Sequence, residues 1–183
     1  MSRNDTKSQF HAKLLRPAMQ GVAAPLAFVL IPNEASSKLP RRGRTTIEGS
    51  MNGHAFRATL DPDGQKSHWL AISEQLLDAA GVDIGDTAAF EIRAVEQEPE
   101  PEVPADLQKA LAACPEAMAT FEDTSTLARV DWIHWVTSAK QPKTRAKRIG
   151  DACDMLASGK RRVCCFDPSG FYSKALRAPE AAD

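Results

Sequence analysis

The pattern of hydrophobic and polar positions changes near residue 96. Before that point apolar and polar residues alternate in short runs, at residues 10–14, 46–48, 56–60, 68–72 and 87–95. A period of two places alternate side chains on opposite faces of a strand. We therefore expect a β-rich domain over residues 8–95.

Turn residues separate these runs. Asn52-Gly53 is a strong two-residue hairpin signal, because both residues tolerate positive φ. Asp61 to Gly64 reads Asp-Pro-Asp-Gly, which suits a type I turn ending on glycine. The same four residues could begin a calcium loop, but the later ligands of such a loop are missing, so the pattern favours a turn.

One short helix is expected between the strands. Ser73 can cap it and Gly81 can end it in the left-handed conformation. Gly85-Asp86 then turns the chain into the strand that starts at Thr87. We expect positive φ at both Gly81 and Gly85.

The β-rich domain contains an internal repeat. Phe10-x-Ala-x-Leu14 recurs as Phe56-x-Ala-x-Leu60, and Gly43-x-Thr45 is paralleled by Gly85-x-Thr87. Each copy reads strand, turn, strand, short helix or loop, glycine turn, strand. Two pseudo-repeats in one chain can close a small β-barrel, and closure removes the edge strands.

Residues 96–103 form the clearest boundary. They contain four glutamates and no basic residue, and prolines alternate with the glutamates. Proline fixes φ and removes a donor, and like charges repel. This segment is predicted to be an extended, solvated acidic linker.

After the linker the apolar period becomes 3.6, which predicts a helical domain over residues 104–162. Its first, second and fourth helices are expected to open at Pro104, Pro115 and Pro142, and the third at a cap of Thr124 or Ser125. The tail, residues 163–183, is a short apolar run followed by a polar end that we expect to be mobile. The predicted class is α+β, with an N-terminal closed barrel followed by a helical bundle.

Composition bounds the function. The chain has 183 residues, of which 43% are hydrophobic and 26% charged, and its net charge is −1. No apolar run is long enough to span a bilayer, and the N-terminus lacks the apolar region of a signal peptide, so we expect a cytoplasmic protein. The charge balance argues against a dedicated nucleic-acid binder but permits a local basic face.

Chemistry-bearing residues are scattered. The four cysteines form no C-x-x-C pair and the four histidines show no metal-ligand spacing. We expect no metal, no cofactor, no small-molecule substrate and no catalytic residue, hence no enzyme. Cys114 and Cys153 should be buried and unbonded. Cys164 and Cys165 follow a basic stretch that could lower a thiolate pKa, so a redox role stands beside an inert one.

A basic cluster is the most suggestive feature. Residues 140–162 hold eight basic and two acidic residues. Lys140, Lys143, Lys147 and Arg148 fall on one arc of the expected fourth helix. This arc could hold an anionic partner: a protein, a nucleic acid or a membrane surface. Alternatively it is a solvated face with Lys147 and Asp151 as an ordinary i,i+4 pair, which the pattern favours.

Other residues nearby are expected to be structural. Arg145 lies at the edge of the apolar arc and should join two helices through Asp131 or through carbonyls of the third helix. Trp132 and Trp135 should pack in the core, and nothing marks His134 as catalytic.

Several of these residues resemble a known signature. The segments Trp132-Ile133, Ala139-Lys140, Thr144-Arg145, Arg148-Ile149 and Gly159-Lys160 resemble the bacteriocin-protection, YdeI/OmpD-associated family. The N-terminal half resembles the small barrel domain of unknown function that often precedes it, through residues such as Asn52-Gly53, Phe56, Leu60 and Gly85-Asp86. The two resemblances together cover residues 8–162.

The barrel also resembles, more distantly, the swapped-hairpin barrels of AbrB-type regulators, which assemble from two chains. The first resemblance implies a bacterial protein linked to tolerance of antimicrobial peptides, and it supplies no catalytic residues. We therefore expect a non-catalytic binding or stress-tolerance module. The alternative is an AbrB-like nucleic-acid-binding regulator. Oligomeric state, the true partner and any binding role of the barrel itself stay open.

Overall fold

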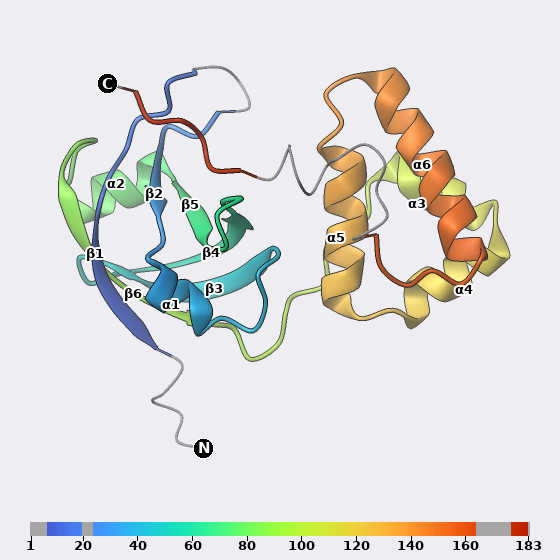
Figure 1. Cartoon of the computed structure of the whole chain (residues 1–183), viewed down its shortest axis with the longest axis horizontal. Coiled ribbons are helices and arrows are strands. Elements are labelled where there is room, and N and C mark those ends of the chain that lie inside the picture. Colours follow the sequence, from blue (N-terminus) through green and yellow to red (C-terminus); the bar gives the residue numbers. More distant parts are fainter. Residues whose placement is uncertain (1–6, 20–23, 164–176, 183) are drawn as a thin grey trace. The chain divides into compact units, whose positions relative to one another are not determined.

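The computed structural model describes residues 7–19, 24–163 and 177–182. The chain divides into two compact units, which are described separately. The first comprises residues 1–97 together with 173–183, and the second comprises residues 98–172. We name them the barrel unit and the helical unit (Figure 1).

The described part of the barrel unit contains six strands and two short helices. The strands are β1 (Ser8–Lys13), β2 (Ala27–Leu30), β3 (Thr45–Met51), β4 (His54–Pro62), β5 (His68–Ile72) and β6 (Thr87–Ala94), and the helices are α1 (Asn33–Ser37) and α2 (Glu74–Ala80). The helix over 74–80 was predicted, whereas α1 occupies a position where a short helix or a loop was expected.

All strand pairs are antiparallel, in the order β1-β6-β3-β4-β5-β2. An isolated bridge between Leu15 and Phe28 joins the two ends, with N–H···O distances of 2.8 and 2.9 Å. The result is a nearly closed barrel, whose strands curve around a common core in Figure 1. The predicted N-terminal barrel and the α+β class are confirmed, although the barrel is nearly closed rather than closed.

Alternating side chains fill the barrel core. Leu14, Ile47, Met51 and Leu60 are fully buried in this core, and Ile47 and Met51 both lie on β3. Gly49 lies between two of them, where β3 approaches β6 closely. A Cβ atom there would lie 1.9 Å from the Glu91 carbonyl oxygen, so only glycine fits this crossing.

The turn chemistry follows the sequence at three of four places. Asn52 and Gly53 have φ of 48° and 84° and connect β3 to β4. Gly81 and Gly85 also have positive φ, and Ser73 caps α2 by accepting from the Leu76 N–H. These predictions are confirmed.

The turn predicted at residues 61–64 lies later in the chain. Asp61 and Pro62 still belong to β4, and the turn is built around Asp63, whose carboxylate accepts from the backbone N–H groups of Gln65 and Ser67. The predicted position is wrong because the pairing of Asp61 with Trp69 and of Pro62 with His68 extends the ladder beyond the local turn signal.

The end of the chain also differs from its prediction. Residues 177–182 return to the barrel unit, where Ala178 donates to the Asp63 carbonyl and Ala182 donates to the Arg16 carbonyl. In the same unit Pro17 and Ala181 form an antiparallel bridge. A polar, mobile end was expected, but main-chain hydrogen bonds hold residues 177–182, and these bonds need no apolar side chain.

The described part of the helical unit contains four helices: α3 (Ala105–Ala112), α4 (Pro115–Asp123), α5 (Thr126–Thr137) and α6 (Pro142–Ala157). Leu107, Leu111, Trp132 and Leu156 are its most deeply buried large side chains. Ser125 caps α5, as one of the two predicted caps, by accepting from the Ala128 N–H. The expected C-terminal helical region is confirmed.

Two details at the first helix are corrected. Pro104 is the N-cap of α3 rather than its first helical residue. Cys114 is not on the apolar face of α3, because the helix ends before it and the residue caps α4 instead.

The cysteine predictions are confirmed only in part. Cys114 and Cys153 are free thiols, but both are half-buried rather than buried. Burial is the main cause that raises the pKa of the Cys153 thiol, which disfavours its reactive thiolate. Cys164 and Cys165 lie outside the described residues.

A buried histidine ties three segments of the barrel unit together. His68 is fully buried; its Nδ1 lies 2.6 Å from the Ser36 hydroxyl of α1 and its Nε2 lies 2.9 Å from the Gly43 carbonyl oxygen. A carbonyl can only accept, so Nε2 carries the proton and Nδ1 accepts from Ser36. Burial is the main cause that lowers the pKa of His68 below 6.5.

Acidification should therefore destabilise the barrel unit through His68. Below pH 6.5 His68 is protonated more readily in the unfolded chain than in the folded barrel. The free energy of unfolding therefore falls as the pH drops through this value. Urea titrations read by fluorine NMR of fluorotryptophan-labelled protein would report this through Trp69, which belongs to β5.

His68→Asn should lose most of this pH dependence, besides costing about 1–3 kcal/mol for the broken buried hydrogen bonds. His54→Asn, at an exposed position, is the matched control and should retain the dependence. An unchanged pH slope in His68→Asn would contradict the assignment.

Candidate functional site

Three lysines at the start of α6 remain candidates for binding. Lys140 lies just before the helix, Lys143 and Lys147 lie in its first turns, and all three are exposed. Lys147 donates to Asp151 at 2.7 Å, which is the predicted i,i+4 pair. We call Lys140, Lys143 and Lys147 the lysine surface.

Arg148 does not belong to this surface, although it was predicted on the same arc. Its Nη1 donates to the Trp135 carbonyl at 2.7 Å and to the Ser138 hydroxyl at 3.2 Å. Its guanidinium carbon also lies 5.5 Å from the centre of the Trp135 ring, within cation–π range. Arg148 therefore ties α6 to the last turn of α5, where helix carbonyls have no intrahelical partner.

Arg145 joins two helices as predicted, but to a different helix. Its Nε and Nη2 donate to the two carboxylate oxygens of Asp106, at 2.6 and 3.0 Å, which connects α6 to α3. The expected acceptors were Asp131 or carbonyls of α5. The hydrogen bond from Arg145 is the main cause that holds the pKa of Asp106 below its ordinary value.

The tryptophans of α5 are core residues, as predicted. Trp132 is fully buried and Trp135 is 3% exposed, and their rings meet edge to face with centres 6.2 Å apart. The Trp132 Nε1 donates to the Arg161 carbonyl at 3.2 Å, which anchors the chain after α6. The remaining motif residues are buried or half-buried: Ile133, Ala139, Thr144 and Ile149.

Glu100 of the acidic linker makes side-chain contacts within the helical unit. Glu100 accepts from the Thr126 hydroxyl at 2.7 Å and pairs with the guanidinium of Arg129. Arg129 also donates to the Thr124 carbonyl, so it closes the N-terminal end of α5. The hydrogen bond from Arg129 is the main cause that lowers the pKa of Glu100. Glu100 is exposed, as predicted for this segment, and its partners in the helical unit were not predicted.

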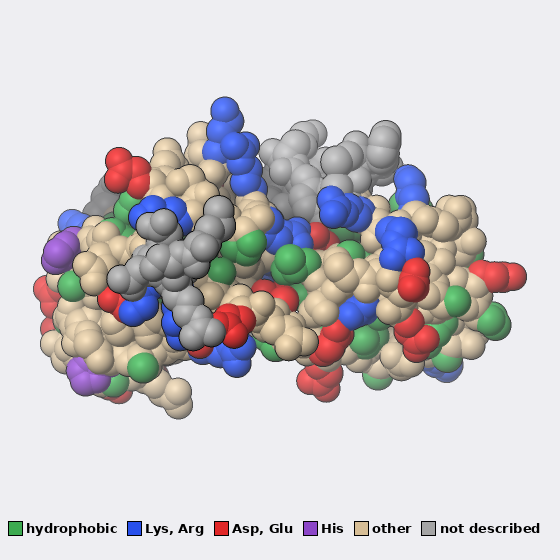
Figure 2. Space-filling model, turned by 90° about the horizontal axis from the view of Figure 1, so that it is seen from below, with side chains coloured by type: hydrophobic (Ala, Val, Ile, Leu, Met, Phe, Trp, Pro, Cys, Tyr) green, Lys and Arg blue, Asp and Glu red, His purple; other side chains and the backbone are tan. Residues whose placement is uncertain are grey.

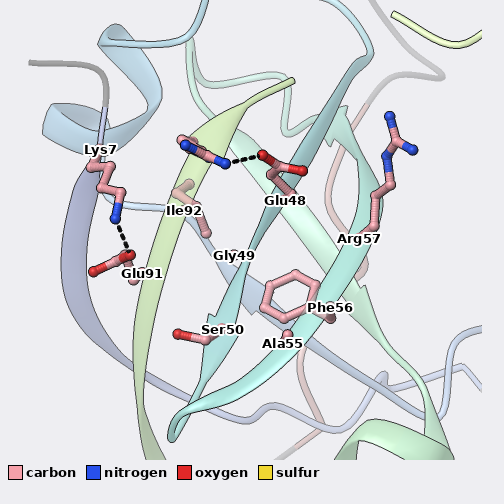
Figure 3. A pocket seen from close by; sticks show the side chains of 10 residues that line it. Lys7, Glu48, Gly49, Ser50, Ala55, Phe56, Arg57, Glu91 and Ile92 are labelled. Atoms are coloured by element: carbon pink, nitrogen blue, oxygen red, sulfur yellow. Dashed lines mark hydrogen bonds and ion pairs between the residues drawn. The ribbon is translucent and has the colours of Figure 1, made fainter. Parts of the chain in front are cut away.

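The barrel unit carries a charged trough of about 560 Å³ on the outer face of its sheet (Figure 3). Small side chains, Ser50 and Ala55, lie opposite each other on β3 and β4 and leave the space open. In the next row Glu48 lies between Arg93 on β6 and Arg57 on β4.

Most charges of the trough neutralise each other. Lys7 pairs with Glu91 at 2.9 Å, and Arg93 pairs with Glu48. The hydrogen bond from Gln9, followed by that from Lys7, lowers the pKa of Glu91. Arg57 is exposed and has no ion pair with the described residues.

Basic and acidic side chains are interspersed on the face drawn in Figure 2, and hydrophobic side chains form only small patches there. Among the described residues no helix is long and apolar enough to cross a membrane. Within the same part of the chain, no three His, Cys, Asp or Glu side chains group in a way that could hold a metal ion.

Comparison with known families agrees with this division into units. Residues 100–159 match the family described as "Bacteriocin-protection, YdeI or OmpD-Associated". Residues 10–92 match the family described as "Domain of unknown function (DUF1905)". No curated protein matches the chain.

The contacts of Arg148 predict a stability effect that the lysine surface does not share. Arg148→Ala leaves the Trp135 carbonyl without this donor and should lower the free energy of unfolding of the helical unit by about 1–3 kcal/mol. Lys143→Ala, at an exposed position on the same helix, should stay within about 0.5 kcal/mol of the parent.

Urea unfolding read by the fluorine signals of Trp132 and Trp135 in fluorotryptophan-labelled protein measures this difference. Equal effects of the two substitutions would show that Arg148 does not hold α5 and α6 together.

Proposed function

Because the chain carries a bacteriocin-protection, YdeI or OmpD-associated domain over residues 100–159, preceded by a domain of unknown function over residues 10–92, we propose that it is a non-catalytic binding module that supports tolerance of bacteriocins or other cationic antimicrobial peptides. It acts inside the cell, and its helical unit holds an anionic partner on the lysine surface. The observation that carries the proposal is the separation of the basic residues of α6 into arginines that bond to neighbouring helices and lysines that are exposed.

The arginines of the family motif are engaged within the unit. Arg145 is bonded to Asp106 and Arg148 to the Trp135 carbonyl, so neither guanidinium is available without loss of a helix contact. Lys140 and Lys143 are exposed and have no ion pair with any described residue, while Lys147 forms an ion pair with Asp151. At the start of α6 the lysines are thus the cations that a partner can bind without breaking a contact between helices.

The charge of this surface decides the class of its partner. A cationic peptide is repelled by three neighbouring lysines, so direct capture of the peptide there is unfavourable. An acidic protein, a nucleic acid or an anionic membrane surface is attracted. Peptide capture would need the acidic linker instead, where Glu100 is already paired with Arg129.

The barrel unit supports a finer proposal about its architecture. The segment β1-β2-α1-β3 and the segment β4-β5-α2-β6 have the same element order. If the strands of one segment are exchanged with those of the other, each pair of neighbouring strands becomes another pair of neighbouring strands. The repeat positions Leu14 and Leu60 are both fully buried. This pattern supports two half-barrels within one chain, the arrangement that AbrB-type regulators obtain from two chains.

A complementation experiment tests the proposed function. A strain that lacks the gene would receive either a variant with Lys140, Lys143 and Lys147 replaced by glutamate, or one with Glu96 and Glu102 replaced by glutamine. We expect the lysine variant to lose peptide tolerance and the glutamine variant to keep it, because the partner is anionic. The measurement is the minimal inhibitory concentration of a cationic peptide, with protein levels matched.

The opposite result, loss only with the glutamine variant, would indicate peptide capture by the linker. Full tolerance with both variants would contradict the proposal. Glu100 is left intact in both, so a change in the stability of the helical unit does not confuse the comparison.

A further inference from the structure

A second basic cluster lies on the barrel unit, where the sequence pattern did not single it out. Three arginines, Arg41, Arg42 and Arg44, occupy the loop between α1 and β3. Lys66 lies in the turn between β4 and β5, and Arg177 begins the described C-terminal segment. We call these five residues the barrel-end cluster.

Hydrogen bonds and an ion pair bring the three segments together. The Gly43 carbonyl accepts from His68, the first residue of β5, at 2.9 Å, and Arg44 pairs with Asp61 of β4 at 2.6 Å. Ala178, next to Arg177, donates to the carbonyl of Asp63 in the turn that contains Lys66, at 3.2 Å. The charges of Arg41, Asp61 and Asp63 all act on the pKa of His68, after the larger effects of burial and of the hydrogen bond to Gly43.

The positive charge of this end is not cancelled locally. Arg44 engages Asp61, and the carboxylate of Asp63 accepts from two backbone N–H groups of its own turn. Arg42, Lys66 and Arg177 are exposed and form no ion pair with the described residues. Arg42, Lys66 and Arg177 are therefore the cations of the cluster that have no ion pair among the described residues.

We infer that the barrel-end cluster binds the phosphodiester backbone of nucleic acid, without reading its sequence. Arginine presents a planar fork of donors that matches phosphate oxygens, and three of the five cations are arginines on one loop. Cations from separate segments suit an extended chain of phosphates better than a single ion. The exposed Arg57 of the trough in Figure 3 lies on β4. Arg44 pairs with Asp61 near the C-terminal end of the same strand.

The composition of the loop disfavours a membrane surface. Peripheral membrane binding combines basic residues with apolar side chains that insert into the lipid. Leu39, the large apolar residue of the loop, is 8% exposed and packs in the barrel core. The overall charge of −1 does not oppose the inference, because four acidic residues lie in the linker, outside the barrel strands.

The test is fluorescence anisotropy with labelled single-stranded and duplex DNA oligonucleotides of unrelated sequences, from about 50 to 200 mM salt. The full chain should bind all of them and lose affinity steeply with salt. The triple variant Arg42→Ala, Lys66→Ala, Arg177→Ala should bind about tenfold more weakly or worse, and the salt slope on duplex should fall by about 0.9 per cation removed.

Two further variants keep the test independent of folding and of the proposed function. The triple variant Arg42→Lys, Lys66→Arg, Arg177→Lys retains the charge and should retain affinity within a few-fold. Replacement of Lys140, Lys143 and Lys147 by alanine removes the lysine surface and should weaken binding to DNA less than the barrel-end triple variant does.

Three outcomes would overturn the inference. The first is no binding by the parent at the lowest salt. The second is a loss of affinity with the lysine-surface variant and none with the barrel-end variant, which would assign the nucleic acid to the helical unit. The third is preferential binding to phosphatidylserine vesicles. The peptide-tolerance experiment is interpreted separately, because its variants leave the barrel-end cluster intact.

Discussion

The helical unit depends on the hydrogen bond from Arg148 to the carbonyl of Trp135. The last carbonyls of a helix lack intrahelical partners, and here they lie beside a buried tryptophan pair. The guanidinium supplies donors to that end of α5 and also covers the Trp135 ring. Arg145 on the same helix fixes α3 through Asp106. Most conspicuous polar and aromatic residues of the family motif are therefore explained by helix packing.

Local chemistry accounts for what could be predicted from the sequence. Asn52-Gly53, Gly81 and Gly85 adopt positive φ because their own backbones require it, whatever surrounds them. The alternating runs indicated the barrel strands, and buried residues such as Leu14 and Leu60 occupy the positions that the repeat predicted. The turn after β4 was misplaced because strand pairing outweighed an Asp-Pro-Asp-Gly signal.

The partners of charged groups could not be predicted in the same way. Arg145 bonds to Asp106, and Glu100 to Arg129, across 39 and 29 residues of sequence. Helical periodicity places a residue on a face but does not say which neighbouring helix supplies the acceptor. Arg148 and Lys147 lie next to each other in sequence, yet one is held against α5 and the other is exposed. The barrel-end cluster was missed for the same reason, since three distant segments assemble it.

The central claim is that the motif arginines act through stability, whereas the exposed lysines act through a partner. The most direct test uses Gly150, an exposed position in α6 with open space around its missing Cβ. Gly150→Ala should stabilise the helix by about 0.5–1 kcal/mol. When Gly150→Ala is added to Arg148→Lys, we expect it to restore both the free energy of unfolding and the peptide tolerance that Arg148→Lys lowers. Recovery of the unfolding free energy with no recovery of tolerance would show that Arg148 itself contacts the partner, which contradicts this account.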